Sequence, residues 1–201
     1  MQKVKRYFRI FVFVVIGFFV CSCGMQSIPK AKNEVEATVA EVVNQYKRRA
    51  DLVPNLVKVV QGYASHEKET LEGVVLARAK ATSVNINANS LTADTLQKFQ
   101  SAQGELSSAL GKLMVVAERY PELKANENFR DLQAQLEGTE NRITVARNRH
   151  IEAIKNYNNL ITVPPSSWTN SLMYNYEKMP QWTVSDSEKQ NIEKPPAIEF
   201  K

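Results

Sequence analysis

The 201-residue chain contains only two cysteines, Cys21 and Cys23, and both lie near its N-terminus. The remainder therefore has no thiol with which to form a disulfide or a thiolate metal site. A fold without such links has to be held together by its apolar core. The hydrophobic content of 43% is sufficient for one, and 23% charged residues is ordinary for a globular protein.

Glycine and histidine are also scarce, and this limits the chemistry open to the chain. The seven glycines are dispersed, and no P-loop, dinucleotide fingerprint or GxSxG motif is present. His66 lacks the second histidine of HExxH, and neither His66 nor His150 follows a glutamate at the spacing of a di-iron bundle. We therefore predict no cofactor, no metal and no enzymatic activity, with His66 on the surface and His150 hydrogen-bonded in a seam between helices.

Basic charge is confined to the N-terminus. The formal net charge is +5, but four lysines and arginines precede residue 10, so residues 24–201 carry only about +1. A nearly neutral body lacks the basic stripe that neutralises phosphates and releases counterions. Nucleic acid is therefore not an expected partner.

The N-terminus has the pattern of an export or anchor segment. Its basic residues precede the apolar stretch Ile10–Val20, whose eleven residues suit a secretory signal better than a span of about 20. The "VCSC" that follows resembles a bacterial lipoprotein signal, which predicts lipidation at Cys23. An uncleaved anchor over residues 7–25 and simple cleavage are the alternatives. In each case the basic N-terminus predicts that the body lies outside the cytoplasm, in the cell envelope.

Four segments show apolar residues at steps of three and four, which is the helical period. They cover residues 35–60, 66–79, 96–120 and 124–163. Ser65 is the expected N-cap of the second, and residues 82–94 form the main connection. No segment alternates as a strand does. We predict an all-α fold, an antiparallel up-and-down four-helix bundle with long helices over residues 29–163, preceded by the hydrophobic segment 1–23.

The stretch "YKRRADLVPNLV" places a proline inside the first predicted helix. Pro54 cannot donate to the carbonyl of Ala50, and an unbroken helix would lose about 3 kcal/mol. A restart with Asp51 as N-cap would make the missing donor harmless. We expect a bend here, with Asn55 serving a freed carbonyl.

Charged residues of this stretch are expected to pair with the middle of the last helix, "GTENRITVARNRH". We predict at least one pair, between Arg48 or Arg49 and Glu140, or between Asp51 and Arg142 or Arg147. Such pairs, if buried, fix register more than they stabilise.

The tail, residues 164–201, has five prolines and scattered aromatic residues without a long period. It is interpreted as an extended strap with one short helix over residues 170–177 and aromatic side chains docked on the bundle. A disordered tail is the alternative, although such tails seldom contain so many aromatic residues.

Two long motifs identify a family resemblance. "YKRRADLVPNLVKVVQGYASHEKETLEGVVLARA" and "YPELKANENFRDLQAQLEGTENRITVARNRHIEAIKNYNNLI" resemble the LemA family over about residues 30–163. The resemblance implies a compact four-helix bundle tethered in bacterial envelopes through an N-terminal hydrophobic segment. "VCSC" and the tail after "VPPSSW" depart from the family pattern. The resemblance implies no reaction.

The expected function is that of a membrane-tethered, non-enzymatic interaction or scaffold module with an envelope protein as partner. One alternative is an envelope hydrolase whose pocket collects Arg49, Asp51 and a carboxylate. Another is lipid or cell-wall binding through the tail aromatics.

Overall fold

The computed structural model describes the backbone of residues 2–87 and 91–182, and the side chains of residues 25–87 and 91–182. Most of the described residues are helical, and none of them lies in a strand. The elements are α1 (Gln2–Tyr63), α2 (Lys68–Ser83), α3 (Ala93–Glu118), α4 (Pro121–Ala125), α5 (Glu127–Thr162), α6 (Ser166–Thr169) and the π-helical turn η2 (Asn170–Tyr174).

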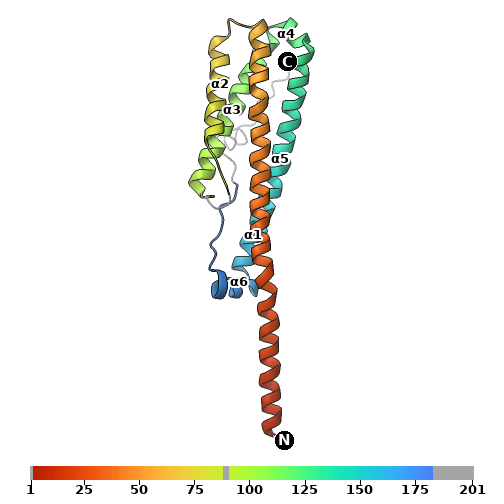
Figure 1. The fold of residues 1–201 in the computed structure, drawn as a ribbon, viewed down its shortest axis with the longest axis vertical. Helices are drawn as coiled ribbons and strands as arrows, with labels where there is room; N and C mark the ends of the chain where they lie inside the picture. The colour runs from red at the N-terminus through yellow and green to blue at the C-terminus, as the bar shows by residue number, and fades with distance from the viewer. Residues whose placement is uncertain (1, 88–90, 183–201) are drawn as a thin grey trace, which may run out of the picture.

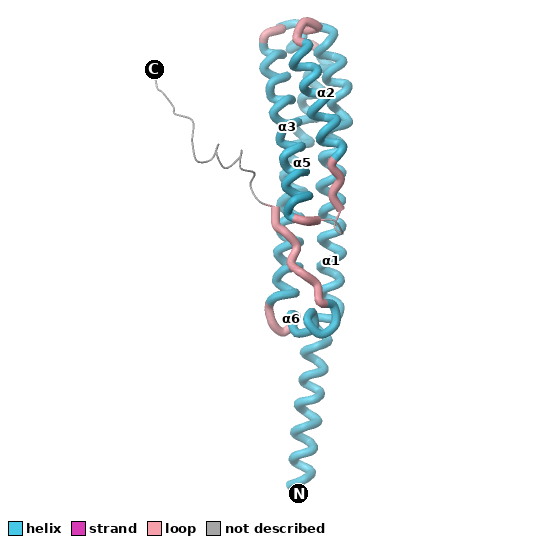
Figure 2. The backbone as a smooth tube through the Cα atoms, turned by 90° about the vertical axis from the view of Figure 1, so that its left-hand side faces the viewer, coloured by secondary structure: helices cyan, strands magenta, loops and turns pink. Residues whose placement is uncertain are grey.

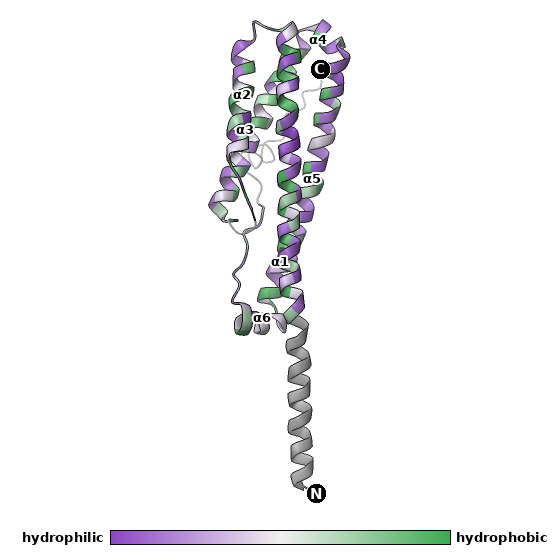
Figure 3. Ribbon diagram, in the orientation of Figure 1, coloured by the Kyte–Doolittle hydropathy of each residue, from purple (hydrophilic) through white to green (hydrophobic). Residues whose placement is uncertain are grey.

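The long helices run side by side and alternate in direction (Figure 1). α1 rises to a turn that leads into α2, α3 rises again, and α5 descends beside α1 along most of its length. Apolar and polar residues alternate along each of these helices, as an amphipathic packing pattern requires (Figure 3).

Two apolar cores lie one above the other. The upper core, far from the N-terminus, joins α1, α2, α3 and α5 through Val53, Leu56, Val74, Leu106, Leu113 and Phe129, among others. The lower core joins α1 and α5 through Val35, Val42, Tyr46, Ile154 and Tyr157, among others. α2 has 16 residues against 36 in α5, or roughly 24 Å against 54 Å at 1.5 Å per residue, so it cannot cover the lower core.

The segment after α5 covers what the short helices leave open. From η2 it turns back as an extended strap, residues 175–182, along α1 and α5 (Figure 2). Asn175 ends the helical turn in the left-handed conformation, with φ of 51°. Trp182, the last described residue of the strap, is a buried member of the lower core. The predicted docked strap is therefore present through residue 182, although its helix spans 166–174 rather than 170–177. Residues 183–201 lie outside the described part.

Helix ends differ from the prediction at two places. Ser65 does not cap the second helix, which begins at Lys68 after Glu67, and His66 lies in the preceding turn. The residues after α3 form the separate helix α4, with Pro121 in its first turn. α5 then begins after Asn126, whose side chain accepts a hydrogen bond from the Phe129 N–H at 3.0 Å.

α1 does not restart at Asp51, so this prediction was wrong. The helix continues through both of its prolines, Pro29 and Pro54. The carbonyl that Pro54 leaves unpaired, on Ala50, accepts a hydrogen bond from Arg78 Nε of α2 at 2.8 Å. Asn55, the residue expected to serve this carbonyl, is exposed. A donor from another helix therefore makes the restart unnecessary.

Pro29 is accommodated in the same way. The residue four positions before it is Met25, whose carbonyl accepts a hydrogen bond from the Tyr174 hydroxyl of η2 at 2.7 Å. Each proline inside α1 thus leaves one backbone carbonyl without its usual N–H donor, and a side chain from a neighbouring helical segment donates to that carbonyl instead. The prolines become points of attachment for α2 and η2.

A double-mutant cycle tests this at Pro54. Arg78→Met should lower the free energy of unfolding by about 2 kcal/mol because the Ala50 carbonyl loses a charged donor. In a Pro54→Ala background the loss should be much smaller, since residue 54 then supplies its own N–H. Chemical denaturation measures both. The control is Lys80→Met, also on α2, which removes the exposed ion pair between Lys80 and Glu105 of α3. This variant should cost under about 1 kcal/mol. Equal losses from Arg78→Met in the two backgrounds would contradict this account.

The predicted export or anchor segment, residues 1–23, falls where side chains are not described. Its backbone from residue 2 continues α1 beyond the base of the bundle (Figure 1). Over the described residues, no helix is long and apolar enough to cross a membrane.

Candidate functional site

A buried arginine lies where α1, α3 and α5 meet. Arg49 is only 1% exposed. Its Nη1 donates to Glu140 Oε1 at 2.7 Å and to Ser107 Oγ at 2.8 Å. Its Nη2 donates to the side-chain Oε1 of Gln103 at 2.7 Å and to the Gln103 carbonyl at 3.1 Å. One guanidinium thus binds three residues on two neighbouring helices.

Gln103 extends this cluster to α2. Its Nε2 donates to the Ala81 carbonyl near the end of α2 at 3.1 Å. Because Gln103 both accepts from Arg49 and donates to Ala81, its amide orientation is fixed at both ends. The cluster of Arg49, Gln103, Ser107 and Glu140, called the Arg49 cluster below, therefore links all four long helices.

The charge of Arg49 is balanced at the edge of the bundle rather than in its centre. Glu140 is 49% exposed while Arg49 is buried. The guanidinium carbon also lies 5.0 Å from the centre of the Tyr46 ring, a favourable position for a cation over an aromatic face. Arg49 Nε, by contrast, has no hydrogen-bond partner in the described part of the chain. The solvated carboxylate thus neutralises a cation that water hardly reaches.

A groove opens beside the Arg49 cluster, between α3 and α5. It encloses about 600 Å³ and is lined by Tyr46 and Arg49 from α1, by α3 from Gln100 to Ser108, by α5 from Glu140 to Arg147, and by Trp182. A second, more apolar pocket of about 330 Å³ continues along the same two helices toward Met114. The two share Ser107 and Glu140. The seam between α3 and α5 is therefore open over much of its length.

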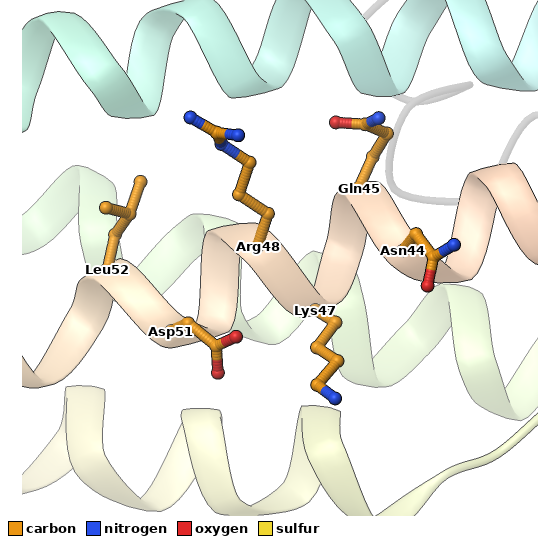
Figure 4. A pocket seen from close by; sticks show the side chains of 6 residues that line it. All are labelled: Asn44, Gln45, Lys47, Arg48, Asp51 and Leu52. Carbon is orange, nitrogen blue, oxygen red and sulfur yellow. The ribbon is translucent and has the colours of Figure 1, made fainter.

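The other residues singled out from the motif do not join the cluster. Arg48 and Asp51 line a separate surface hollow on α1. Arg48 points toward α5, whereas Asp51 points toward α2, so Asp51 does not make the predicted pair with Arg142 or Arg147 (Figure 4). Pro54, Asn55 and Arg142 are exposed. Of the predicted charge pairs, the structure forms the one between Arg49 and Glu140.

Gln103 and Ser107 were missed by sequence reasoning. Gln103 follows Phe99 by four positions and precedes Leu110 by seven, so it falls on the apolar stripe of α3. The available signal was a polar residue, Gln103, at an apolar position of one helix, together with an arginine, Arg49, at an apolar position of a helix expected to pack against it. It indicates a buried hydrogen-bond partner.

A second buried polar group lies in the lower core. His150 is 1% exposed, and its Nδ1 lies 3.1 Å from Thr38 Oγ1. The Thr38 hydroxyl lies 3.0 Å from the carbonyls of Glu34 and Val35 in its own helix, so it donates there and accepts from His150 Nδ1–H. Among the described residues His150 Nε2 has no hydrogen-bond partner, and burial lowers the pKa of His150 from 6.5 to about 4. The predicted hydrogen-bonded seam histidine is confirmed.

Trp182 packs on this histidine and closes the lower core. Its ring meets His150 edge to face at 6.2 Å and stacks parallel to Tyr46 at 6.5 Å. The Arg147 guanidinium lies 5.1 Å from the Trp182 ring centre. Asn158 fixes the strap behind it, because its amide donates to the Met179 carbonyl and accepts from the Met179 N–H. The strap is thus an integral part of the packed structure.

Burial also affects one tyrosine under the strap. The Tyr157 hydroxyl donates to the Glu177 carbonyl at 3.2 Å. Burial raises the pKa of Tyr157 above 10.0, with the neighbouring Tyr176 as a second cause. Tyr157 therefore acts as a neutral donor that holds the strap.

The arrangement is suited to holding helices and presenting a surface. Within the described side chains, no group of three or more His, Cys, Asp and Glu residues could hold a metal ion. The groove offers hydroxyl, amide and charged groups from α3 and α5 beside two aromatic rings. Such a lining can hydrogen-bond a polar segment of another chain.

Comparison with known proteins places this architecture in a family. A sequence model of the LemA family matches residues 38–200. The chain belongs to the LemA family. Protein LemA of Metamycoplasma hominis is 23% identical over 196 residues, which cover 94% of this chain and 81% of that protein. The LemA match includes the Arg49 cluster, His150 and the strap, so the tail is part of the family's length and not the departure that the sequence suggested.

Proposed function

We propose that this LemA family protein is a membrane-tethered, non-enzymatic interaction module of the bacterial cell envelope. Its antiparallel four-helix bundle stands outside the cytoplasm, held through lipid on Cys23 or through an uncleaved anchor over residues 7–25. The partner is an envelope protein that docks in the open seam between α3 and α5. The observation that carries this proposal is the groove of about 600 Å³, whose floor is fixed by the Arg49 cluster.

The chemistry of the seam favours a protein segment as occupant. The end near Trp182 offers hydroxyls and amides from Gln100, Ser101, Ser108 and Thr144. The end near Met114 offers apolar surface from Leu110 and Leu136. A groove that is polar at one end and apolar at the other suits an amphipathic segment, which would hydrogen-bond at one end and bury side chains at the other.

The position of the charged residues supports binding over catalysis. Both Nη atoms of Arg49 are used by protein groups. The hydrolase alternative requires Arg49, Asp51 and a carboxylate in one pocket, but Asp51 points toward α2 and away from the groove (Figure 4). Glu105, another carboxylate of the groove, is paired with Lys80.

Tethering to the membrane allows the groove to bind a partner even when its affinity is low. A bundle confined to a membrane plane meets neighbouring envelope proteins at a higher effective concentration than a freely diffusing one. Modest affinity in the seam is then sufficient for a stable association.

Site-specific photo-crosslinking in living cells tests the proposal. A photoreactive amino acid is placed at Ser108 or Thr144, both exposed in the groove, and at Glu72 or Thr82 of α2 as matched exposed controls. We expect a discrete crosslinked protein at the groove positions and none at the control positions. Absence of a product at the groove positions, or equal products at all four, would contradict the proposal.

A further inference from the structure

Exposed apolar side chains gather at the base of the bundle. Ten large hydrophobic side chains are exposed in the described part of the chain, and five of them belong to this region. They are Met25 (43%), Val163 (54%), Trp168 (60%), Leu172 (80%) and Met173 (53%). These five residues are called the foot below. A cluster of this kind on a soluble surface is unusual and marks an interaction site.

The exposure of the foot is a consequence of how α6 and η2 are held. Thr169 and Asn170 are buried, and the Asn170 side chain accepts from the Tyr176 N–H and donates to the Tyr176 carbonyl, each at 3.0 Å. This fixes which side of the turn faces the bundle. Trp168 and Leu172, four positions apart and on either side of these buried residues in the sequence, are left on the outer side.

The foot lies beside the point where α1 leaves the bundle. The Tyr174 hydroxyl, bonded to the Met25 carbonyl, attaches η2 to α1 at this level. Figures 1 and 2 show α6 at the base, with α1 continuing below it. The apolar stretch of the sequence ends at Val20, five residues before Met25, or about 8 Å along a helix.

This separation matches the dimensions of a bilayer surface. The headgroup layer occupies roughly 5–8 Å on each side of the hydrocarbon core. If residues 7–25 form the anchor, Met25 stands at its outer end, next to the headgroup layer. If instead lipid is attached to Cys23, Met25 is two residues from the anchor and again lies at the surface.

We infer that the foot is a second membrane contact, which inserts into the headgroup layer and fixes the orientation of the bundle on the bilayer. Tryptophan is the side chain that most favours this layer, and leucine and methionine beside it bury apolar area there. One tether would let the bundle lean in any direction. With the foot seated, the α3–α5 seam is held at a constant angle to the membrane. The inference rests on the membrane tether of the proposed function.

The two tryptophans of the chain allow a direct test in the full-length protein. The chain is reconstituted into vesicles of phosphatidylcholine and phosphatidylglycerol whose acyl chains are brominated near the headgroup. Flotation first measures attachment to the vesicles. Tryptophan emission is then compared with that in unbrominated vesicles, for the native protein and for Trp168→Phe, in which only the buried Trp182 emits.

We expect the native protein to float and to lose most of its Trp168 emission in brominated vesicles, while Trp168→Phe shows no quenching. A chain that does not float contradicts the tether and the foot together. A chain that floats with its emission unquenched contradicts the foot alone.

Exposed substitutions provide a second readout without disturbing the core. Leu172→Asp should abolish most of the quenching, whereas Leu76→Asp, at a 70% exposed position on α2, should leave it unchanged. Full quenching in Leu172→Asp would overturn the inference. Deletion after Val163 would be a poor test, because it removes Trp182 from the lower core.

Discussion

Replacing Glu140 with alanine is expected to lower the free energy of unfolding by about 3 kcal/mol, although this carboxylate is about half exposed. The reason lies in its partner. Arg49 is 1% exposed, so removal of Glu140 leaves a buried cation without a counterion. The lost stability comes from burying the unpaired charge of Arg49. It is therefore larger than the exposure of Glu140 alone would suggest. Chemical denaturation of the single variant measures the effect.

Two further variants separate this cause from a general effect of cutting side chains on α5. Glu137→Ala removes a neighbouring exposed glutamate whose side chain, among the described residues, accepts a hydrogen bond along its own helix from Gln133. It should change the free energy of unfolding by no more than about 0.5 kcal/mol. In an Arg49→Met background, Glu140→Ala should likewise cost only about 0.5 kcal/mol, because no buried cation remains. A full loss from Glu140→Ala in that background would show that the carboxylate acts through something other than Arg49.

The sequence predicted the helical elements because their signal is local. Apolar residues at steps of three and four gave α3 and α5 nearly their full lengths and gave the part of α1 that packs in the bundle, since periodicity records which face each helix buries. The pairing of Arg49 with Glu140 also followed, because both residues lie beside apolar stripes of helices that had to pack. Periodicity did not reveal the division between α4 and α5, which depends on Asn126 acting as a cap.

The surroundings of Pro54 could not be predicted from the neighbouring sequence. Considered alone, the proline predicts a restart at Asp51 and a bend, with only the neighbouring Asn55 available to serve the freed carbonyl. The donor is the side chain of Arg78, which lies 28 positions after Ala50 in the sequence. It can reach the Ala50 carbonyl only because α2 packs on α1. Trp182 was likewise expected to dock but could not be placed beside His150, because an extended strap has no period from which its register could be derived. Contacts between segments far apart in sequence decided each case.

Acidification is expected to destabilise the protein through His150. In the unfolded chain this histidine takes up its proton near pH 6.5, whereas burial holds the pKa in the folded protein near 4. Between these values the unfolded state binds the extra proton, so stability is full above about pH 6.5 and falls as the pH decreases toward 4. The interval between the two pKa values corresponds to roughly 3 kcal/mol. Urea denaturation at several pH values measures this slope.

His150→Leu isolates the contribution, because carboxylates that titrate in the same range are common to both proteins and cancel in the difference. We expect the leucine variant to lose less stability than the native protein between pH 6.5 and 4. His66→Gln, at an exposed position, is the matched control and should keep the native slope. Identical slopes in the native protein and His150→Leu would mean that the ring gains its proton without cost. That outcome would require a hydrogen-bond partner for Nε2, which is buried and has none within the described part of the chain.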